Sequence, residues 1–217
     1  MKKIAILIIL ILNLTAAANN ASDFLIYGLS ARAFAMGNSF TSMSGSGDSI
    51  FFNPAAVAVS LKNTEYTTSA VNNFDEVDRK NIGWLSRLDQ LGFGDDKNIV
   101  GAAYSSELVE DIPKTSWADD RPLEEGSFDS GKHNITLTFA RELNHNLYYG
   151  VNLRQYSYKL GNYYADAQGY DAGLVYKIPD NYFNSPAVLG LTLHNIGRTK
   201  IVWSTEHTDT IPFRLNL

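Results

Sequence analysis

The alternation of apolar and polar residues between positions 133 and 160 constrains this fold more than any other feature. Every second residue is apolar from Ile135 to Phe139, and the same period of two returns from Leu147 to Leu153. Successive side chains of a β-strand point to opposite faces of the sheet, so this period predicts strands with one apolar face. The three polar residues at 144–146 are enough for a turn, and the sequence therefore predicts a long antiparallel hairpin.

Shorter segments of the same kind occur on both sides of this hairpin. They raise the expected number of strands to about eight, and none of them has the 3.6-residue period of a helix. We expect the connection 106–131 to be a long polar loop without secondary structure, because it contains two prolines and several acidic residues. The further expected strands are 63–74, 81–88, 98–105, 170–177, 187–195 and 211–217.

Two all-β folds are compatible with this pattern. A soluble β-sandwich would turn the apolar faces inward, whereas a transmembrane β-barrel would turn them outward. The segment 147–160 exceeds the roughly 5–6 residues usual for strands in soluble sheets, and tyrosines stand near the strand ends, where a membrane interface would hold them. The sequence therefore favours an antiparallel transmembrane β-barrel. The tyrosines in question are Tyr148, Tyr149, Tyr156, Tyr158, Tyr163, Tyr164, Tyr176 and Tyr182.

The first 18 residues have the layout of a cleaved secretory signal peptide. Lys2 and Lys3 precede an apolar run that is well short of the roughly 20 residues of a membrane-spanning helix, and Ala16 to Ala18 offer a cleavage site. This short form is typical of an exported bacterial protein. The sequence has no cysteine, which excludes disulfides, a lipid anchor on cysteine and thiolate metal sites.

The N-terminal segment, residues 19–60, differs from everything that follows it. Between 28 and 59 it is rich in glycine and small residues, and Pro54 follows Asn53 where a short helical turn is expected. It has too few large apolar residues to fold alone. We therefore expect the N-terminal segment to pack into or onto the larger body formed by residues 61–217.

Several short motifs follow one another in an order that points to a known family. In the N-terminal segment they are Gly28, Ala31-Arg32-Ala33, Met36-Gly37, Phe40, Asp48 and Asn53-Pro54-Ala55. Further along they are Tyr149-Gly150-Val151-Asn152-Leu153, Tyr170-Asp171-Ala172-Gly173-Leu174, Gly190-Leu191, Asn195-Ile196-Gly197 and Ile211-Pro212-Phe213-Arg214-Leu215. The ordered set resembles the PorV/PorQ group of outer-membrane proteins, which belongs with the FadL-like fatty acid transport porins.

The resemblance implies a 14-stranded outer-membrane barrel with the N-terminal segment folded inside it as a hatch. It implies passage of hydrophobic compounds or, as an alternative, service in type IX secretion by holding cargo at the cell surface. The implied partners are outer-membrane lipid, hydrophobic small molecules or secreted cargo proteins, and the barrel assembly machinery. A barrel of about eight strands has no room for a hatch of some 30 residues, so either the hatch lies outside the barrel or the reading frame is truncated, and we expect the second.

The resemblance also supplies the candidate site. Its hatch motif is Gly28, Arg32, Met36, Gly37, Asp48, Asn53, Pro54 and Ala55. We expect this motif to anchor the hatch against the barrel wall, with Arg32 and Asp48 pairing with lumen-facing charges such as Arg154 or Asp171. The simpler interpretation of Asn53-Pro54-Ala55 is a plain turn before a short helix.

No pattern of residues predicts catalysis, and we expect a protein that is not an enzyme and has no cofactor. The histidines lack metal-site spacing, and the paired acidic residues of the loops fit solvated surface better than Ca²⁺ ligands. A net charge of −5 argues against binding to nucleic acid. The remaining alternative of another class is a soluble β-sandwich adhesin or binding module.

Overall fold

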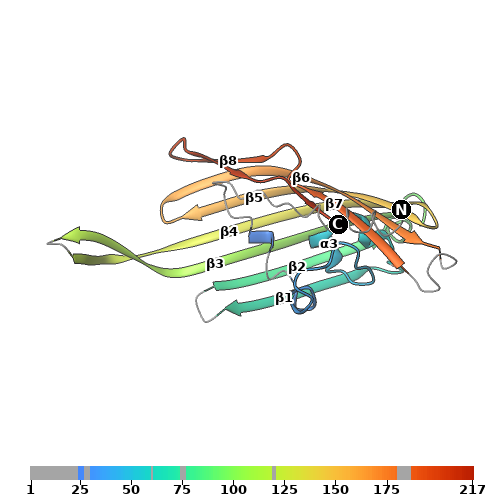
Figure 1. The fold of residues 1–217 in the computed structure, drawn as a ribbon, viewed down its shortest axis with the longest axis horizontal. Coiled ribbons are helices and arrows are strands. Elements are labelled where there is room, and N and C mark those ends of the chain that lie inside the picture. The colour runs from blue at the N-terminus through green and yellow to red at the C-terminus, as the bar shows by residue number, and fades with distance from the viewer. Residues whose placement is uncertain (1–23, 27–29, 60, 74–76, 119–120, 180–186) are drawn as a thin grey trace, which may run out of the picture.

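A single antiparallel sheet makes up most of the computed structural model (Figure 1). The structure describes residues 24–26, 30–59, 61–73, 77–118, 121–179 and 187–217. Eight strands follow one another across the sheet in the order β1-β2-β3-β4-β5-β6-β7-β10, and β8 pairs with β6 and β9. The strands are β1 (Glu65–Asn73), β2 (Val77–Arg87), β3 (Asn98–Ala118), β4 (Arg121–Asn144), β5 (Leu147–Leu160), β6 (Tyr163–Ile178), β7 (Ala187–His194), β8 (Thr199–Trp203), β9 (Thr208–Ile211) and β10 (Arg214–Asn216).

The predicted all-β antiparallel class is confirmed, and so is the predicted central hairpin. β5 occupies the range expected from the alternation, and β4 pairs with it in a regular register from Ser130↔Leu160 to Glu142↔Tyr148. The period of two fixed this register, since a shift by one residue would move every apolar side chain to the opposite face. β8 and β9 were not predicted, because segments of five and four residues are too short to show a period.

The expectation of an unstructured loop over 106–131 is wrong. These residues extend β3 and β4 into a long hairpin that projects beyond the rest of the sheet (Figure 1). Past Leu108 and Ser130, the two strands pair only with each other among the described residues. Bulges after Val109 and Pro113 accommodate the proline and the irregular sequence, while the ladder still pairs most backbone groups.

The described residues of the N-terminal segment lie on one face of the sheet and include four short helices. They are η1 (Phe24–Ile26), α2 (Ala31–Ala35), α3 (Ser49–Phe52) and η2 (Pro54–Val59). Ser30 caps α2 by accepting a hydrogen bond from the backbone N–H of Ala33, and Pro54 opens η2, where its missing N–H costs nothing. Among the described residues, no helix has both the length and the apolar character needed to cross a membrane.

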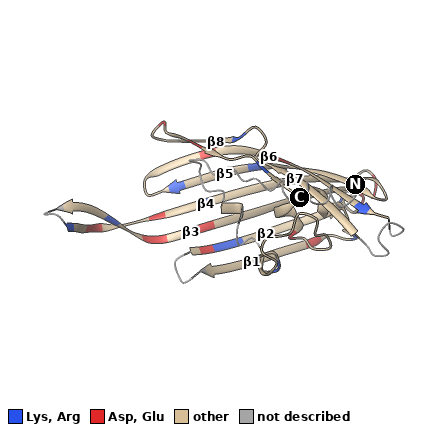
Figure 2. Ribbon diagram, in the orientation of Figure 1, with Lys and Arg blue, Asp and Glu red and all other residues tan. Residues whose placement is uncertain are grey.

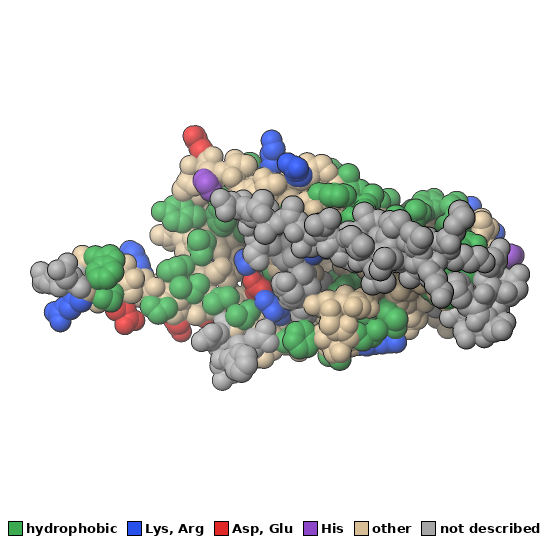
Figure 3. All heavy atoms as spheres, in the orientation of Figure 1, with side chains coloured by type: hydrophobic (Ala, Val, Ile, Leu, Met, Phe, Trp, Pro, Cys, Tyr) green, Lys and Arg blue, Asp and Glu red, His purple; other side chains and the backbone are tan. Residues whose placement is uncertain are grey.

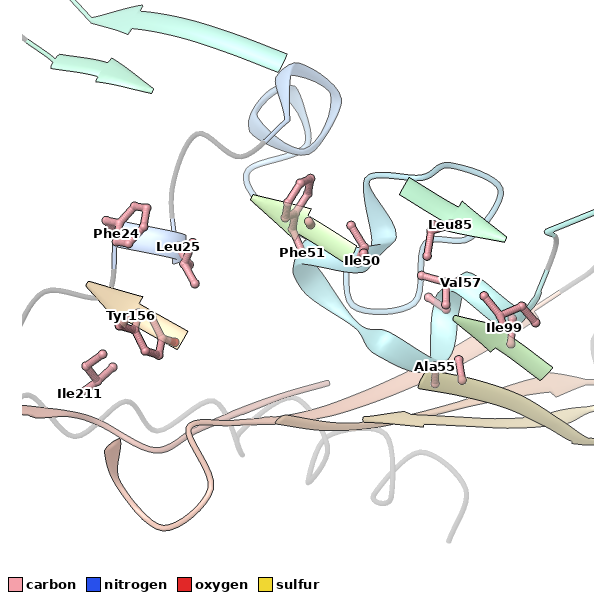
Figure 4. Close-up of a cluster of buried hydrophobic side chains, with 14 of the residues drawn as sticks. Phe24, Leu25, Ile50, Phe51, Ala55, Val57, Leu85, Ile99, Tyr156 and Ile211 are labelled. Carbon is pink, nitrogen blue, oxygen red and sulfur yellow. The ribbon is translucent and has the colours of Figure 1, made fainter. Parts of the chain in front are cut away.

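The hydrophobic core lies between the N-terminal segment and the sheet. Ile50 and Val57 point toward Leu85 of β2 and Ile99 of β3, and a second group places Phe24 and Leu25 beside Tyr156 of β5 (Figure 4). Burying a side chain of this size contributes about 1.5–3 kcal/mol. The helices of the N-terminal segment are too short to be stable alone, so this burial is what holds them in place.

Candidate site between the N-terminal segment and the sheet

Asn53 is the central anchor of the N-terminal segment. It is fully buried, and its side-chain amide donates to the backbone oxygen of Thr41 at 2.7 Å and to that of Leu174 in β6 at 3.3 Å. Its Oδ1 accepts from the backbone N–H of Ala55 at 3.0 Å, which shapes the turn into η2. One side chain thus closes the local turn and fastens it to the sheet. Both interpretations of the Asn53-Pro54-Ala55 motif, as a turn and as an anchor, therefore describe real contacts.

The sheet offers a flat platform of glycines beneath this anchor. A Cβ atom at Gly150 in β5 would lie 2.4 Å from the carbonyl carbon of Pro54, and one at Gly173 in β6 would lie 2.0 Å from Oδ1 of Asn53. On β7, a Cβ at Gly190 would lie 2.4 Å from the backbone oxygen of Thr41. Only glycine permits this approach of backbone to backbone. Each of these three neighbouring strands therefore has glycine, which lacks a side chain, at the point where the N-terminal segment contacts it.

A buried polar cluster continues from the platform along the same face. Arg154 of β5 and Asp171 of β6 are each 2% exposed, and Nε of Arg154 lies 2.5 Å from Oδ2 of Asp171. Nδ1 of His194 lies 3.4 Å from the same carboxylate oxygen. The backbone N–H of Asn195 donates to Oδ1 of Asp171 at 3.1 Å. Burying these charges is expensive, but the carboxylate is satisfied on both oxygens.

The same cluster reaches into the N-terminal segment. Nη2 of Arg154 donates to the backbone oxygen of Phe51 at 3.2 Å, and Nδ2 of Asn152 donates to that of Ile50 at 3.4 Å. These two carbonyls belong to α3, whose last carbonyl groups have no partner within so short a helix. The strands thus supply donors for the backbone acceptors that α3 exposes.

The expected pairing of the charges of the N-terminal segment with Arg154 or Asp171 is wrong. Arg154 and Asp171 face the N-terminal segment as predicted, but they pair with each other. Asp48 instead accepts hydrogen bonds from Ser30, at 2.6 Å, and from the hydroxyl of Thr67 in β1. Arg32 lies on the exposed side of α2, with its guanidinium 5.9 Å from the ring centre of Phe40. Arg154 and Asp171 pair with each other because their strands, β5 and β6, are adjacent in the sheet.

The other residues of the predicted motif have local roles or none. Gly37 has a φ of 63° directly after α2, where its N–H and that of Asn38 bond back to carbonyls of the helix and end it. Met36 is exposed, and Pro54 and Ala55 are buried against the sheet. Gly28 lies outside the described residues, as does the predicted signal peptide.

Sequence reasoning missed the glycine platform, although a signal for it exists. Gly150, Gly173 and Gly190 all occupy buried positions of their strands, on the face that bears the N-terminal segment. A glycine inside a strand weakens it and often marks a close approach of another backbone. Three such glycines on adjacent strands could have placed the contact before the structure did.

The opposite face of the sheet is apolar and exposed. One row across six strands consists of Tyr66, Trp84, Ala102, Leu137, Leu153 and Tyr170, which are neighbours in the strand register. Leu137 is 51% exposed and Tyr66 is 77% exposed. On β6, the positions of this face from Tyr170 to Ile178 are all apolar. Figure 3 gives the view onto the other face, which bears the N-terminal segment, and there charged side chains lie among the hydrophobic ones.

A polar row borders this apolar face on the side of the projecting hairpin. Its members, neighbours in register, are Lys80, Ser106, His133, Ser157 and Asp166. Figure 2 likewise shows charged residues gathered toward that end of the sheet and long uncharged stretches along the middle of the strands. The apolar face is therefore a band with a defined edge.

Ion pairs occur at both ends of the strands. Near the hairpin, Glu107 is held by Arg79 at 2.7 Å and by Lys132 at 2.8 Å on the face that bears the N-terminal segment. At the other end, in the turn after β2, the hydrogen bond from Arg87 lowers the pKa of Asp89 from its ordinary value. No three His, Asp or Glu side chains in the part of the chain that the structure describes are arranged to hold a metal ion.

Comparison with known proteins assigns no family to the chain. No protein-family model matches it, and no curated protein is significantly similar to it.

Proposed function

We propose that this sheet is part of the wall of a β-barrel in a bacterial outer membrane, and that the barrel allows hydrophobic compounds to pass. The observation that carries the proposal is the inverted polarity of the sheet. Apolar side chains occupy its open face, whereas charged and amide side chains are buried on the face that holds the N-terminal segment. In a water-soluble protein the two faces would be exchanged.

The dimensions of the apolar band support a membrane setting. A tilted strand needs about 9–11 residues to cross the hydrocarbon layer, and the apolar stretch of β6 from Tyr170 to Ile178 has that length. Soluble monomers seldom expose apolar patches of more than a few hundred Å². A band that runs in register across six strands is of the kind that lipid would cover.

The covered face supports a barrel interior rather than a second lipid face. Arg154 and Asp171 lie at the depth of the band, where exposure to lipid would be costly, and they point away from it. The N-terminal segment fills the space on that side. In the proposed barrel it is a hatch that narrows the interior, so that a solute passes by shape and not through covalent chemistry.

The same polarity argues against the soluble β-sandwich. A sandwich buries the apolar face of its sheet against a second sheet about 10 Å away. Here the layer packed on the sheet is the N-terminal segment, and it covers the polar face. An adhesin of this design would leave its most apolar surface in water.

Fractionation of cells that express the full chain tests the location. We expect the protein in the outer-membrane fraction, resistant to extraction with alkaline carbonate, and we expect cells that carry it to take up labelled fatty acid faster than cells with the empty vector. A product that stays in the soluble fraction after mild lysis would end the barrel proposal. If the protein is found in the outer membrane but fatty acid uptake does not rise, the barrel proposal stands and the proposed passage of hydrophobic compounds is rejected.

The projecting hairpin favours type IX secretion as a second candidate function. The β3–β4 hairpin extends well past the apolar band, and Trp117 near its tip is 79% exposed. Such an arm suits contact with a cargo protein at the surface better than it suits a pore. Deleting residues 110–128 in a strain that secretes cargo by this pathway should then release cargo from the cell surface without affecting fatty acid uptake.

A further inference from the structure

The part of the N-terminal segment between Thr41 and Val59 touches the strands one after another across the sheet. On β1, Thr67 donates a hydrogen bond to Asp48. On β2 and β3, Ile50 packs over two glycines: a Cβ at Gly83 would lie 3.5 Å from its Cγ2, and one at Gly101 would lie 3.1 Å from its Cδ1. Contacts with β4 come from η2. A single short segment therefore reaches four neighbouring strands on one side of the sheet.

The contacts continue over the other half of the sheet. β5 is reached through Gly150, Asn152 and Arg154, and β6 through Gly173 and the backbone oxygen of Leu174. On β7, Gly190 lies against the backbone of Thr41 and Ser42. Strands that are far apart in the chain thus share one partner, and that partner precedes all of them in the sequence.

We propose that residues 41–59 are an internal scaffold on which the sheet is assembled, and not a removable plug. A plug would need a surface that separates easily from the wall. Here the contacts are backbone atoms resting on glycines, together with buried hydrogen bonds to Asn53, Phe51 and Ile50, and all of them would be left unsatisfied if the segment withdrew. The proposal rests on the proposed function for the membrane setting of the refolding test and for the uptake that the second test measures.

The kinetics of refolding distinguish a scaffold from a late contact. A group that is already bound in the transition state lowers the refolding rate when it is removed, whereas a group that binds afterwards mainly raises the unfolding rate. The test uses the full chain, refolded from urea into dodecyl maltoside micelles and followed by tryptophan fluorescence. The variant is Asn53→Ala, and its matched control is Asn134→Ala, whose buried amide bonds to groups of the sheet itself, Gln155 and Thr136.

For Asn53→Ala we expect refolding to be about tenfold slower, with little change in the unfolding rate. This is the effect expected if two to three buried hydrogen bonds are already formed in the transition state and are lost in the variant. Asn134→Ala should act mainly on unfolding. The proposal is overturned if Asn53→Ala refolds at the rate of the unaltered chain and only unfolds faster. If Asn53→Ala fails to refold at all, Asn53→Asp, which keeps the acceptor for Ala55 but loses the donor, gives the rate instead.

A reversible lock provides a second test. The chain has no cysteine, and a Cβ at Gly47 would lie 3.2 Å from Cβ of Thr67, so a small outward shift would bring the pair to the roughly 3.5–4.5 Å of a disulfide. In the double variant Gly47→Cys/Thr67→Cys, a fixed scaffold predicts equal fatty acid uptake in the oxidised and reduced states. Uptake that stops on oxidation and returns on reduction would overturn the proposal. Absence of uptake in both states would instead contradict the proposed function, while the refolding test would still decide the role of the scaffold.

Discussion

Asn53 and Gly173 are in contact so close that no side chain fits between them. Oδ1 of Asn53 occupies the place where the first carbon of any side chain at position 173 would stand. The contact joins the best-supported motif of the N-terminal segment to the middle of β6. The two positions are therefore sensitive to opposite changes. Asn53 cannot lose its side-chain amide, and Gly173 cannot gain a side chain.

Gly173→Val should therefore destabilise the protein strongly. The added carbons would displace Asn53 and its hydrogen bonds, and we expect a loss of about 2–4 kcal/mol, combining overpacking with unsatisfied buried groups. Urea unfolding in micelles measures this loss. Ala172→Val, the neighbouring position on the exposed face of β6, is the control and should change stability by less than about 0.5 kcal/mol. Equal effects of the two variants would contradict the platform.

The ion pair between Arg154 and Asp171 should be far more sensitive to single than to double substitution. Arg154→Leu or Asp171→Leu alone leaves a buried charge without its partner, which typically costs about 3–5 kcal/mol. The double variant removes both charges and should be closer to the unaltered chain than either single variant, apart from the lost bond to Phe51. The free energy of unfolding from urea titration gives the comparison. If the two single losses simply added in the double variant, the charges would not be coupled.

Charge on the apolar band should be tolerated only at its edge. Leu137→Arg puts a cation in the middle of the band, where a membrane setting predicts a cost of about 2–4 kcal/mol, while Ser157→Arg in the polar border row should cost about 0–1 kcal/mol. The amount of folded protein in the outer-membrane fraction reports the difference. A soluble protein would tolerate both arginines, because position 137 would then face water.

The projecting hairpin should contribute little to the stability of the sheet. Trp117→Ala removes a large side chain that is mostly in solvent, so we expect a change in the free energy of unfolding within about 0.5 kcal/mol. Limited proteolysis should cut the hairpin of the intact protein before it cuts β5 or β6. Protection of the hairpin in the purified chain would show that it packs against something in solution.

The period of two predicted the strands. The prediction was most accurate for a strand whose two neighbouring strands in the sheet are both long. The range predicted for β5 matches the structure, because its alternation from Leu147 to Leu153 is regular and its partners fix the register. The hairpin over 106–131 was missed since prolines, glycine and acidic residues hide the alternation, and two bulges interrupt it. Composition favours a loop there, but pairing of the two strands satisfies the backbone and overrides that preference.

The site was predicted in part. The prediction of which charged residues pair with one another failed, because pairing depends on which strands are neighbours in the sheet. Asn53, Pro54 and Ala55, which the motif resemblance singled out, lie at the contact, and Arg154 and Asp171 lie on the face of the sheet that bears the N-terminal segment. Which charges pair could not be read from the sequence, because it depends on β5 and β6 being adjacent and in register at Asn152↔Asp171. Asp48 lies next to β1, where it accepts hydrogen bonds from Ser30 and Thr67.

The glycine platform also constrains how the sequence can change during evolution. With less than one methyl group of clearance at Gly150 and Gly173, the N-terminal segment and the two central strands cannot drift independently. A lineage that gains a side chain at either glycine must at the same time reshape the Asn53-Pro54-Ala55 turn. Related chains should therefore keep these features together or lose them together, and such covariation would be visible in any sufficiently deep set of homologues.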